Sequence, residues 1–166
     1  MAPIFPLSYY KHFLLHLQSR GDVVFITYDD FPWSDADTYQ NGYPLEWSSW
    51  NNLLSKKEID QNKIYCVIHH DTDSGPAETI EMAKVEQELG IRSSIMTFNR
   101  WNPNGCVEPY PIDWDELKKL KSNDFCIGYH CNAMHLSGFN IDRAYSEFDY
   151  DINSLNKFFN VRFFCP

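Results

Sequence analysis

The stretch KIYCVIHHDTDSGP (Lys63–Pro76) contains the pattern on which the fold class of this chain depends. Its apolar run climbs to Ile68 and predicts a buried strand over residues 64–69. The run then meets two histidines, an aspartate, a threonine and a second aspartate, and Pro76 begins a helical pattern that continues to Leu89. In folds that alternate parallel strands with helices, chemistry gathers at the C-terminal ends of the strands. The stretch therefore predicts a strand–helix unit with a functional site where the two elements join.

The same alternation continues on both sides of this unit. Predicted strands cover residues 23–28, 64–69, 92–98, 125–130 and 161–166, and predicted helices cover residues 8–20, 76–89, 113–122 and 141–159. A further short helix is predicted over Trp50–Ile59, inside an aromatic-rich stretch. This order predicts an α/β fold with a parallel sheet covered by helices, either wound open or closed as a barrel. Residues 1–166 are interpreted as a single domain, and the apolar end at Pro166 suggests that the fold continues beyond it.

The composition narrows the class of protein. The chain has 166 residues, of which 43% are hydrophobic and 16% aromatic, as is typical of a globular domain with a buried core. Its formal net charge of −9 and isoelectric point near 5.0 disfavour binding to nucleic acid or to an anionic membrane surface. No apolar run approaches the roughly 20 residues of a membrane span, and no secretory signal is visible, so we expect a cytoplasmic protein. The five cysteines include no CxxC pair and fit reduced thiols.

A second predicted strand also ends on ligand-type residues. His130 closes the apolar strand at residues 125–130, and His135 follows in the next loop. Because side chains two apart in a strand share a face, Asp71 and Asp73 can point into one pocket. Carboxylates combined with two imidazoles are a common ligand set for a catalytic divalent metal, with Zn²⁺ favoured. These four residues therefore predict a metal site at the strand ends.

The neighbouring polar residues have less direct interpretations. His69 and His70 are interpreted as residues that line the site, bond a ligand or belong to the core, rather than as ligands themselves. Asp71 and Asp73 could instead only cap the following helix, but that interpretation leaves the histidines unexplained. Asp29 and Asp30 also follow an apolar strand, yet no helix–glycine–strand unit comes after them, so we assign them to a surface loop.

Two segments, VIHHDTDSGPAETIEMAKVEQELGIRSSIMTF and FCIGYHCNAMH, carry a family resemblance. They resemble the polysaccharide deacetylase (NodB-homology, carbohydrate esterase family 4) superfamily, in the branch whose aspartate pair is split as D-x-D after a histidine. The resemblance covers most of residues 8–159. It implies a distorted (β/α) barrel, incomplete here at its C-terminal side, because the later Arg-Pro, Asp-Trp and catalytic-histidine motifs are not identifiable. It also implies a metal-dependent de-N-acetylase that acts on a carbohydrate.

Carried over residue by residue, the resemblance implies Asp71 as the general base and Asp73, His130 and His135 as metal ligands. The histidines are separated by four residues, whereas the family pair is usually separated by three. The bound metal would activate water, and the free carboxylate would take its proton as the water attacks an acetamide carbonyl. The D-x-D branch suggests bacterial surface-polysaccharide biosynthesis of the O-antigen type, with an N-acetylated saccharide as substrate. The oligomeric state is not predicted.

Two other functions remain open at this level. A phosphotransferase like the haloacid dehalogenases would use Asp71 as a nucleophile, because VIHHDTDS resembles the D-x-D strand of that class. A barrel remnant without catalytic activity would bind only a metal or a glycan. Aromatic residues in predicted loops could line a glycan cleft or simply pack over the sheet: Trp33, Tyr39, Tyr43, Trp47, Trp50 and Trp101.

Overall fold

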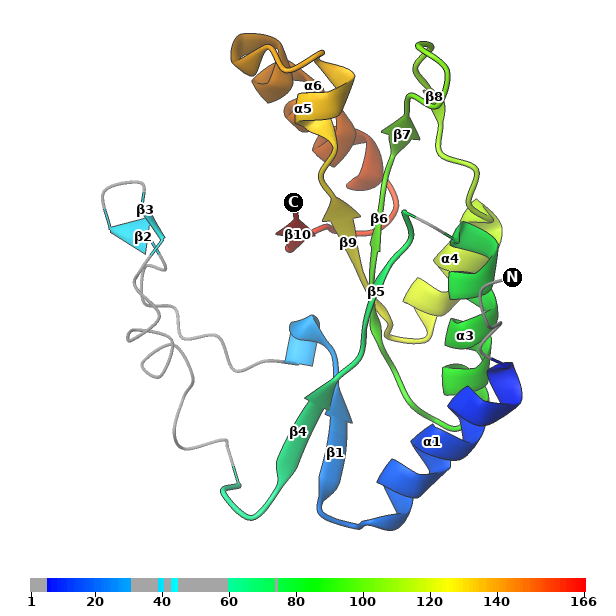
Figure 1. The fold of residues 1–166 in the computed structure, drawn as a ribbon. Helices are drawn as coiled ribbons and strands as arrows, with labels where there is room; N and C mark the ends of the chain where they lie inside the picture. The colour runs from blue at the N-terminus through cyan, green and yellow to red at the C-terminus, as the bar shows by residue number, and fades with distance from the viewer. Residues whose placement is uncertain (1–5, 31–38, 41–42, 45–59, 74) are drawn as a thin grey trace.

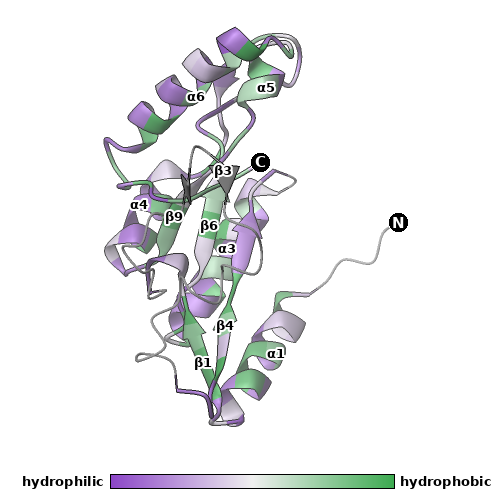
Figure 2. Ribbon diagram, turned by 90° about the vertical axis from the view of Figure 1, so that its left-hand side faces the viewer, coloured by the Kyte–Doolittle hydropathy of each residue, from purple (hydrophilic) through white to green (hydrophobic). Residues whose placement is uncertain are grey.

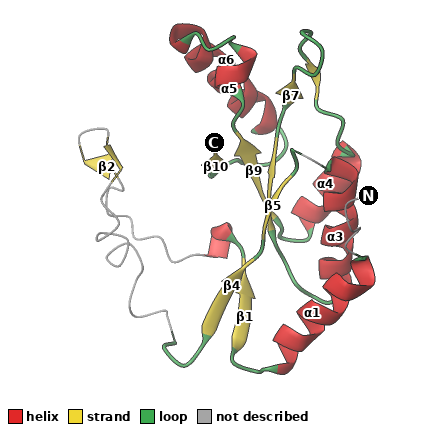
Figure 3. Ribbon diagram, viewed as in Figure 1, coloured by secondary structure: helices red, strands yellow, loops and turns green. Residues whose placement is uncertain are grey.

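The computed structural model describes residues 6–30, 39–40, 43–44, 60–73 and 75–166. Within them the chain alternates strands and helices, as the sequence predicted (Figures 1 and 3). The helices are α1 (Leu7–Ser19), η1 (Tyr28–Asp30), α3 (Pro76–Glu88), α4 (Trp114–Ser122), α5 (Ala133–Leu136) and α6 (Ile141–Leu155). The strands are β1 (Val23–Ile26), β2 (Tyr39–Gln40), β3 (Tyr43–Pro44), β4 (Ile64–Val67), β5 (His69–Asp71), β6 (Ser94–Thr97), β7 (Arg100–Trp101), β8 (Glu108–Pro109), β9 (Cys126–His130) and β10 (Phe164–Cys165). The predicted helix over Trp50–Ile59 lies outside the described residues.

A curled sheet of four parallel strands, in the order β5-β6-β9-β10, forms the centre of the fold (Figure 1). A second parallel pair, β1 with β4, adjoins it, because β4 continues into β5 after the single residue Ile68. The amide of Ser94 donates to the Ile68 carbonyl at 2.9 Å, so the hydrogen bonding to β6 begins at this junction. The expected α/β class is confirmed. Closure into a complete barrel is not seen among the described strands.

Helices α1, α3 and α4 lie along one side of the strands, and α6 packs near the end of β9 (Figure 1). Side-chain caps explain where two helices begin: Asp113 accepts hydrogen bonds from the Asp115 and Glu116 amides, and Asn140 accepts one from the Arg143 amide. The main core lies between the sheet and α3, α4 and α6; its most buried members include Ala83, Ile95, Leu117, Ile127, Leu155 and Phe159. This core fixes the strand ends that carry the candidate site.

Several boundaries differ from those predicted. β1 ends at Ile26 because the next residues turn into η1, where the Asp30 carboxylate accepts hydrogen bonds from the amide and hydroxyl of Thr27 at 2.7 and 2.9 Å. α6 ends at Leu155, although the apolar phase runs to Phe159, because tight turns after the helix still bury Phe159 in the core. β10 is shorter than the predicted strand at 161–166. The hairpins β2–β3 and β7–β8 were not predicted.

Hydropathy follows this architecture. Figure 2 shows hydrophobic residues concentrated in strands such as β1 and β9, whereas α6 carries both hydrophilic and hydrophobic residues along its length. α6 is amphipathic, as a helix packed on a sheet by one face must be. Every helix in the described ranges is too short or too polar to cross a bilayer.

Candidate metal centre

Burial alternates along the HHDTD segment, from β5 into the residues that follow it. His69, Asp71 and Asp73 are exposed, whereas His70 and Thr72 are buried. The three exposed residues are two apart in the sequence, as the alternation of an extended chain requires, and a pocket shared by Asp71 and Asp73 stays a prediction. β5 pairs with β6 in the register His69↔Ser94 to Asp71↔Met96, and the Thr72 amide continues the ladder to the Met96 carbonyl. The two carboxylates therefore stand at the C-terminal edge of the parallel sheet.

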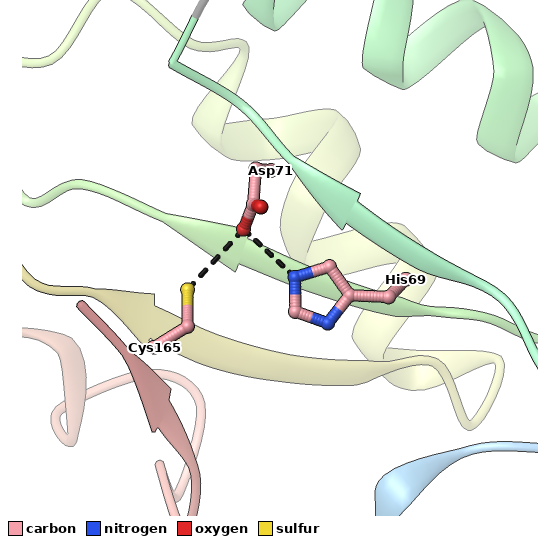
Figure 4. Close-up of side chains that lie close together, drawn as sticks. All are labelled: His69, Asp71 and Cys165. Atoms are coloured by element: carbon pink, nitrogen blue, oxygen red, sulfur yellow. Dashed lines mark hydrogen bonds and ion pairs between the residues drawn. The ribbon is translucent and has the colours of Figure 1, made fainter.

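Three side chains from two strands meet at this edge (Figure 4). One carboxylate oxygen of Asp71 accepts a hydrogen bond from Nε2 of His69 at 2.8 Å and another from Sγ of Cys165 at 3.2 Å. One potential ligand atom from each of the three residues lies within 4.8 Å of the other two. Cys165 reaches the site because β10 pairs with β9 in the register Cys165↔His130. These three residues form a His/Asp/Cys group of the kind that can hold a divalent metal.

His130 stands beside this group, at the end of β9. Its Nε2 lies 4.0 Å from Oδ1 of Asp71 and 3.9 Å from Oδ2 of Asp73. The imidazole stacks on the ring of Phe98, with 4.5 Å between the ring centroids, and its side chain is only 12% exposed. Its other nitrogen, Nδ1, is buried without a hydrogen-bond partner among the described residues. The ring is therefore held firmly, with Nε2 directed at the two carboxylates.

The charges of the site follow from these contacts. Burial alone would raise the pKa of Asp71, but the hydrogen bonds from His69 and Cys165 and the nearby imidazoles outweigh it, so this pKa lies below its ordinary value. Burial, together with the hydrogen bond to the Asp71 carboxylate and its charge, raises the pKa of Cys165 to about 12. At neutral pH the group therefore contains an ionised carboxylate and a protonated thiol.

A second hydrogen bond orients the His69 ring. The Tyr28 hydroxyl lies 2.9 Å from Nδ1 of His69. Burial, then the nearby Cys165 and Asp71, raises the pKa of Tyr28, so its hydroxyl keeps its proton. Because the Asp71 carboxylate only accepts, Nε2 of His69 donates to it, and in the neutral ring Nδ1 then accepts from Tyr28. Tyr28, His69 and Asp71 thus form a directed chain of hydrogen bonds.

Other candidate residues lie elsewhere. His135 is exposed on α5, and no hydrogen bond or ion pair within the described ranges joins it to Asp73 or His130. His70 points away from the site into the core, where it bonds to Glu86. Asp29 lies in η1, not in an irregular surface loop, and its carboxylate pairs with Lys121 at 3.2 Å.

Sequence reasoning missed Cys165. The signal was available, because Cys165 sits at the end of the last apolar run, where the strand-end rule applies as it does to His130. Tyr28 was also passed over. Its contact with His69 depends on how β1 and η1 lie against β5, and no local pattern reports that placement.

The structure also contains a groove of about 590 Å³, which none of Asp71, Asp73, His130 and Cys165 lines. Phe98 stacks on His130, and the next two residues, Asn99 and Arg100, line the groove. The remaining lining residues come mainly from the β7–β8 hairpin, α4 and the end of α6, and include Trp114, Lys118, Tyr150, Lys157 and Phe158. The volume is typical of small-molecule sites. Three aromatic side chains, Trp114, Tyr150 and Phe158, thus line the groove.

Comparison of the chain with models of known protein families, with curated proteins and with solved structures found no match.

Proposed function

We propose that this chain is a metal-dependent hydrolase that removes N-acetyl groups from a carbohydrate. The observation that carries the proposal is the meeting of Asp71, Asp73 and His130 at the C-terminal edge of parallel strands, with Nε2 of His130 3.9–4.0 Å from both carboxylates. Chemistry in β/α folds is found at this edge. The residues that meet there are those for which the resemblance to polysaccharide deacetylases implies base and ligand roles.

The strand order supports the finer proposal of a distorted (β/α) barrel. The parallel neighbours follow the chain in sequence, from β1 through β4 and β5 to β6, β9 and β10. A barrel adds each new strand beside the last one, whereas a doubly wound sheet reverses direction at a switch point. Among the described strands of this parallel series, no such reversal occurs.

The donor atoms suit Zn²⁺. A tetrahedral ion with bonds of about 2.0–2.1 Å separates its ligand atoms by about 3.3–3.4 Å. The 3.9 Å between Asp73 and His130 needs only a small side-chain adjustment to reach that value. Imidazole, carboxylate and thiol together form a set that zinc accepts. We assign ligand roles to Asp73 and His130, which leaves Asp71 free to act as a base.

Two residues compete for the third ligand position. The resemblance implies His135, whose ring is exposed on α5. Cys165 is already at the site, 3.2 Å from Asp71, but its thiol would have to lose its proton on binding the metal. A thiolate ligand would give the cobalt-substituted protein a strong sulfur-to-metal charge-transfer band, which a histidine ligand would not.

Bound Zn²⁺ would supply Lewis acidity and lower the pKa of a coordinated water to roughly 7. Asp71, ionised at neutral pH, accepts the proton of the water that attacks the acetamide carbonyl. His69 holds the carboxylate in place through its Nε2–H, and Tyr28 fixes the tautomer of that ring. The chain thereby presents a base whose charge and direction are set before the substrate arrives.

The substrate we propose is an N-acetylated saccharide. Sugar rings stack on aromatic side chains, and the 590 Å³ groove presents Trp114, Tyr150 and Phe158. On the D-x-D resemblance we propose a role in bacterial surface-polysaccharide biosynthesis, with a cytoplasmic location as part of that proposal.

Metal content and activity test the proposal together. We expect the purified protein to hold about one divalent metal per chain, and the Asp73→Ala and His130→Ala variants to lose it. His16→Ala, which removes an exposed histidine from α1, is the matched control and should retain the metal. The parent should release acetate from N-acetylated oligosaccharides. Full metal retention by both site variants would refute the site, and a Mg²⁺-dependent aspartyl-phosphate would favour a phosphotransferase instead.

A further inference from the structure

A buried carboxylate lies directly behind the candidate metal centre. Glu86 of α3 has no exposed surface, and its Oε1 lies 2.6 Å from Nε2 of His70, whose side chain is 9% exposed. The Tyr10 hydroxyl of α1 donates a hydrogen bond to the same oxygen. One atom thus joins two helices to the strand that carries His69 and Asp71.

The direction of these hydrogen bonds can be worked out. Burial, together with the adjacent Glu86 carboxylate, raises the pKa of Tyr10 far above its ordinary value, so Tyr10 donates. Because Oε1 of Glu86 accepts the hydrogen bond from Tyr10, we take Nε2 of His70 as the second donor to it. A buried acceptor with two donors is costly to disrupt, because the groups left behind lose their partners away from water.

The apolar pattern that normally decides which side chains of a strand face the core is missing within β5. Register is normally set by apolar side chains that seek the core, and a slip of one residue turns every side chain to the other face. In HHDTD every residue is polar, and the last apolar residue that favours this facing is Ile68, which packs against Tyr10 and Leu14 just before the strand. A core acceptor that bonds an imidazole extends this choice through β5, because it holds His70 inward and therefore His69 and Asp71 outward.

We propose that Glu86 is a positioning residue, which helps to set the facing of β5 and so presents His69, Asp71 and the following ligand Asp73 to the metal centre. Tyr10 donates a second hydrogen bond to the same oxygen of Glu86, and His70 is the β5 residue that bonds to this oxygen. The effect on metal binding rests on the proposed function. The facing of the strand does not depend on it.

The first test measures, without any metal, whether His69 or His70 is the exposed histidine of β5. In the parent, diethyl pyrocarbonate should modify the exposed His69 and leave His70 protected, as tandem mass spectrometry can resolve. In Glu86→Met we expect His70 to lose this protection. Leu120→Ala, which weakens the core from α4, is the control and should keep the parent pattern despite its lower stability. A Glu86→Met variant in which His70 stays protected would overturn the proposal.

The second test measures metal affinity well below the melting temperature. We expect Glu86→Met to bind zinc about 10–100-fold more weakly than the parent, as for other residues that orient ligands, and Leu120→Ala to bind normally. If Glu86→Met does not fold, His70→Gln and His70→Leu replace it. Glutamine can still donate to Glu86 and should keep the affinity, whereas leucine should lose it, and equal affinities would overturn the proposal. A parent without metal affinity would refute the proposed function, while the labelling pattern would still decide the role of Glu86.

Discussion

The Asp71→Asn substitution tests whether Asp71 acts as a general base or as a metal ligand. The substitution keeps the shape of the side chain and a carbonyl oxygen that can still accept from His69 and Cys165, but it removes the charge. Asp71 lies beside the proposed ligands, with Oδ1 4.0 Å from Nε2 of His130, and is not itself assigned to the metal. We therefore expect metal content to stay near that of the parent.

Activity should respond much more strongly than metal content. Loss of general-base help costs on the order of 10²–10⁴-fold in rate, and the amide that replaces the carboxylate in Asp71→Asn cannot accept a proton at neutral pH. The assay is acetate release from N-acetylated saccharides, with zinc content measured on the same preparation. Undiminished turnover would refute the role of base, and a parallel loss of metal and activity would make Asp71 a ligand.

The same variant has a pH signature. The pKa of Asp71 is lowered in the folded protein, so its ionised form contributes stability that is present above the unfolded pKa and lost as the pH falls through the folded pKa. Asp71→Asn should therefore unfold with a weaker pH dependence across the acidic range.

The nearby charge also raises the pKa of the Cys165 thiol, so in the variant Cys165 should react faster with iodoacetamide at about pH 9. An unchanged alkylation rate would contradict the contact between the two side chains.

Further predictions concern the scaffold. Gly128→Ala should loosen β10 and weaken metal binding, because a Cβ there would collide with the Met96 thioether and lie 2.9 Å from the Phe163 carbonyl. Amide exchange of Cys165 would measure the loosening of β10, and zinc titration would measure the loss of metal affinity. Asp151→Ala should lower the free energy of unfolding by about 3 kcal/mol in urea titrations, because this fully buried carboxylate holds Arg100 at 2.7 Å. A loss below about 1 kcal/mol would show that the ion pair is not structural.

Local patterns were enough for the main elements. The apolar periodicity of α3 and the apolar runs of β6 and β9 predicted elements that the structure confirms within a few residues. The facing of Asp71 and Asp73 followed from strand geometry, and His130 followed from its place at a strand end. These features depend only on residues close together in the chain.

Other features depend on contacts that sequence patterns do not report. The approach of Cys165 to Asp71 requires β10 to pair beside β9 in one particular register. The β7–β8 hairpin consists of two residue pairs, too short for any alternation to be seen. For His70 a supporting or a core role was expected, and only its hydrogen bond to Glu86, 16 residues away, decides for the core. Each of these was decided by tertiary packing.

The contact between Cys165 and Asp71 joins residues 94 positions apart, and this has a consequence for folding. Closing so long a loop costs more chain entropy than pairing the neighbouring strands β5 and β6, so we expect β10 to dock late. If Cys165 then takes part in metal binding, the ion and the last strand are thermodynamically linked. Each would raise the affinity of the other by the same factor, and zinc binding would then report the docking of β10.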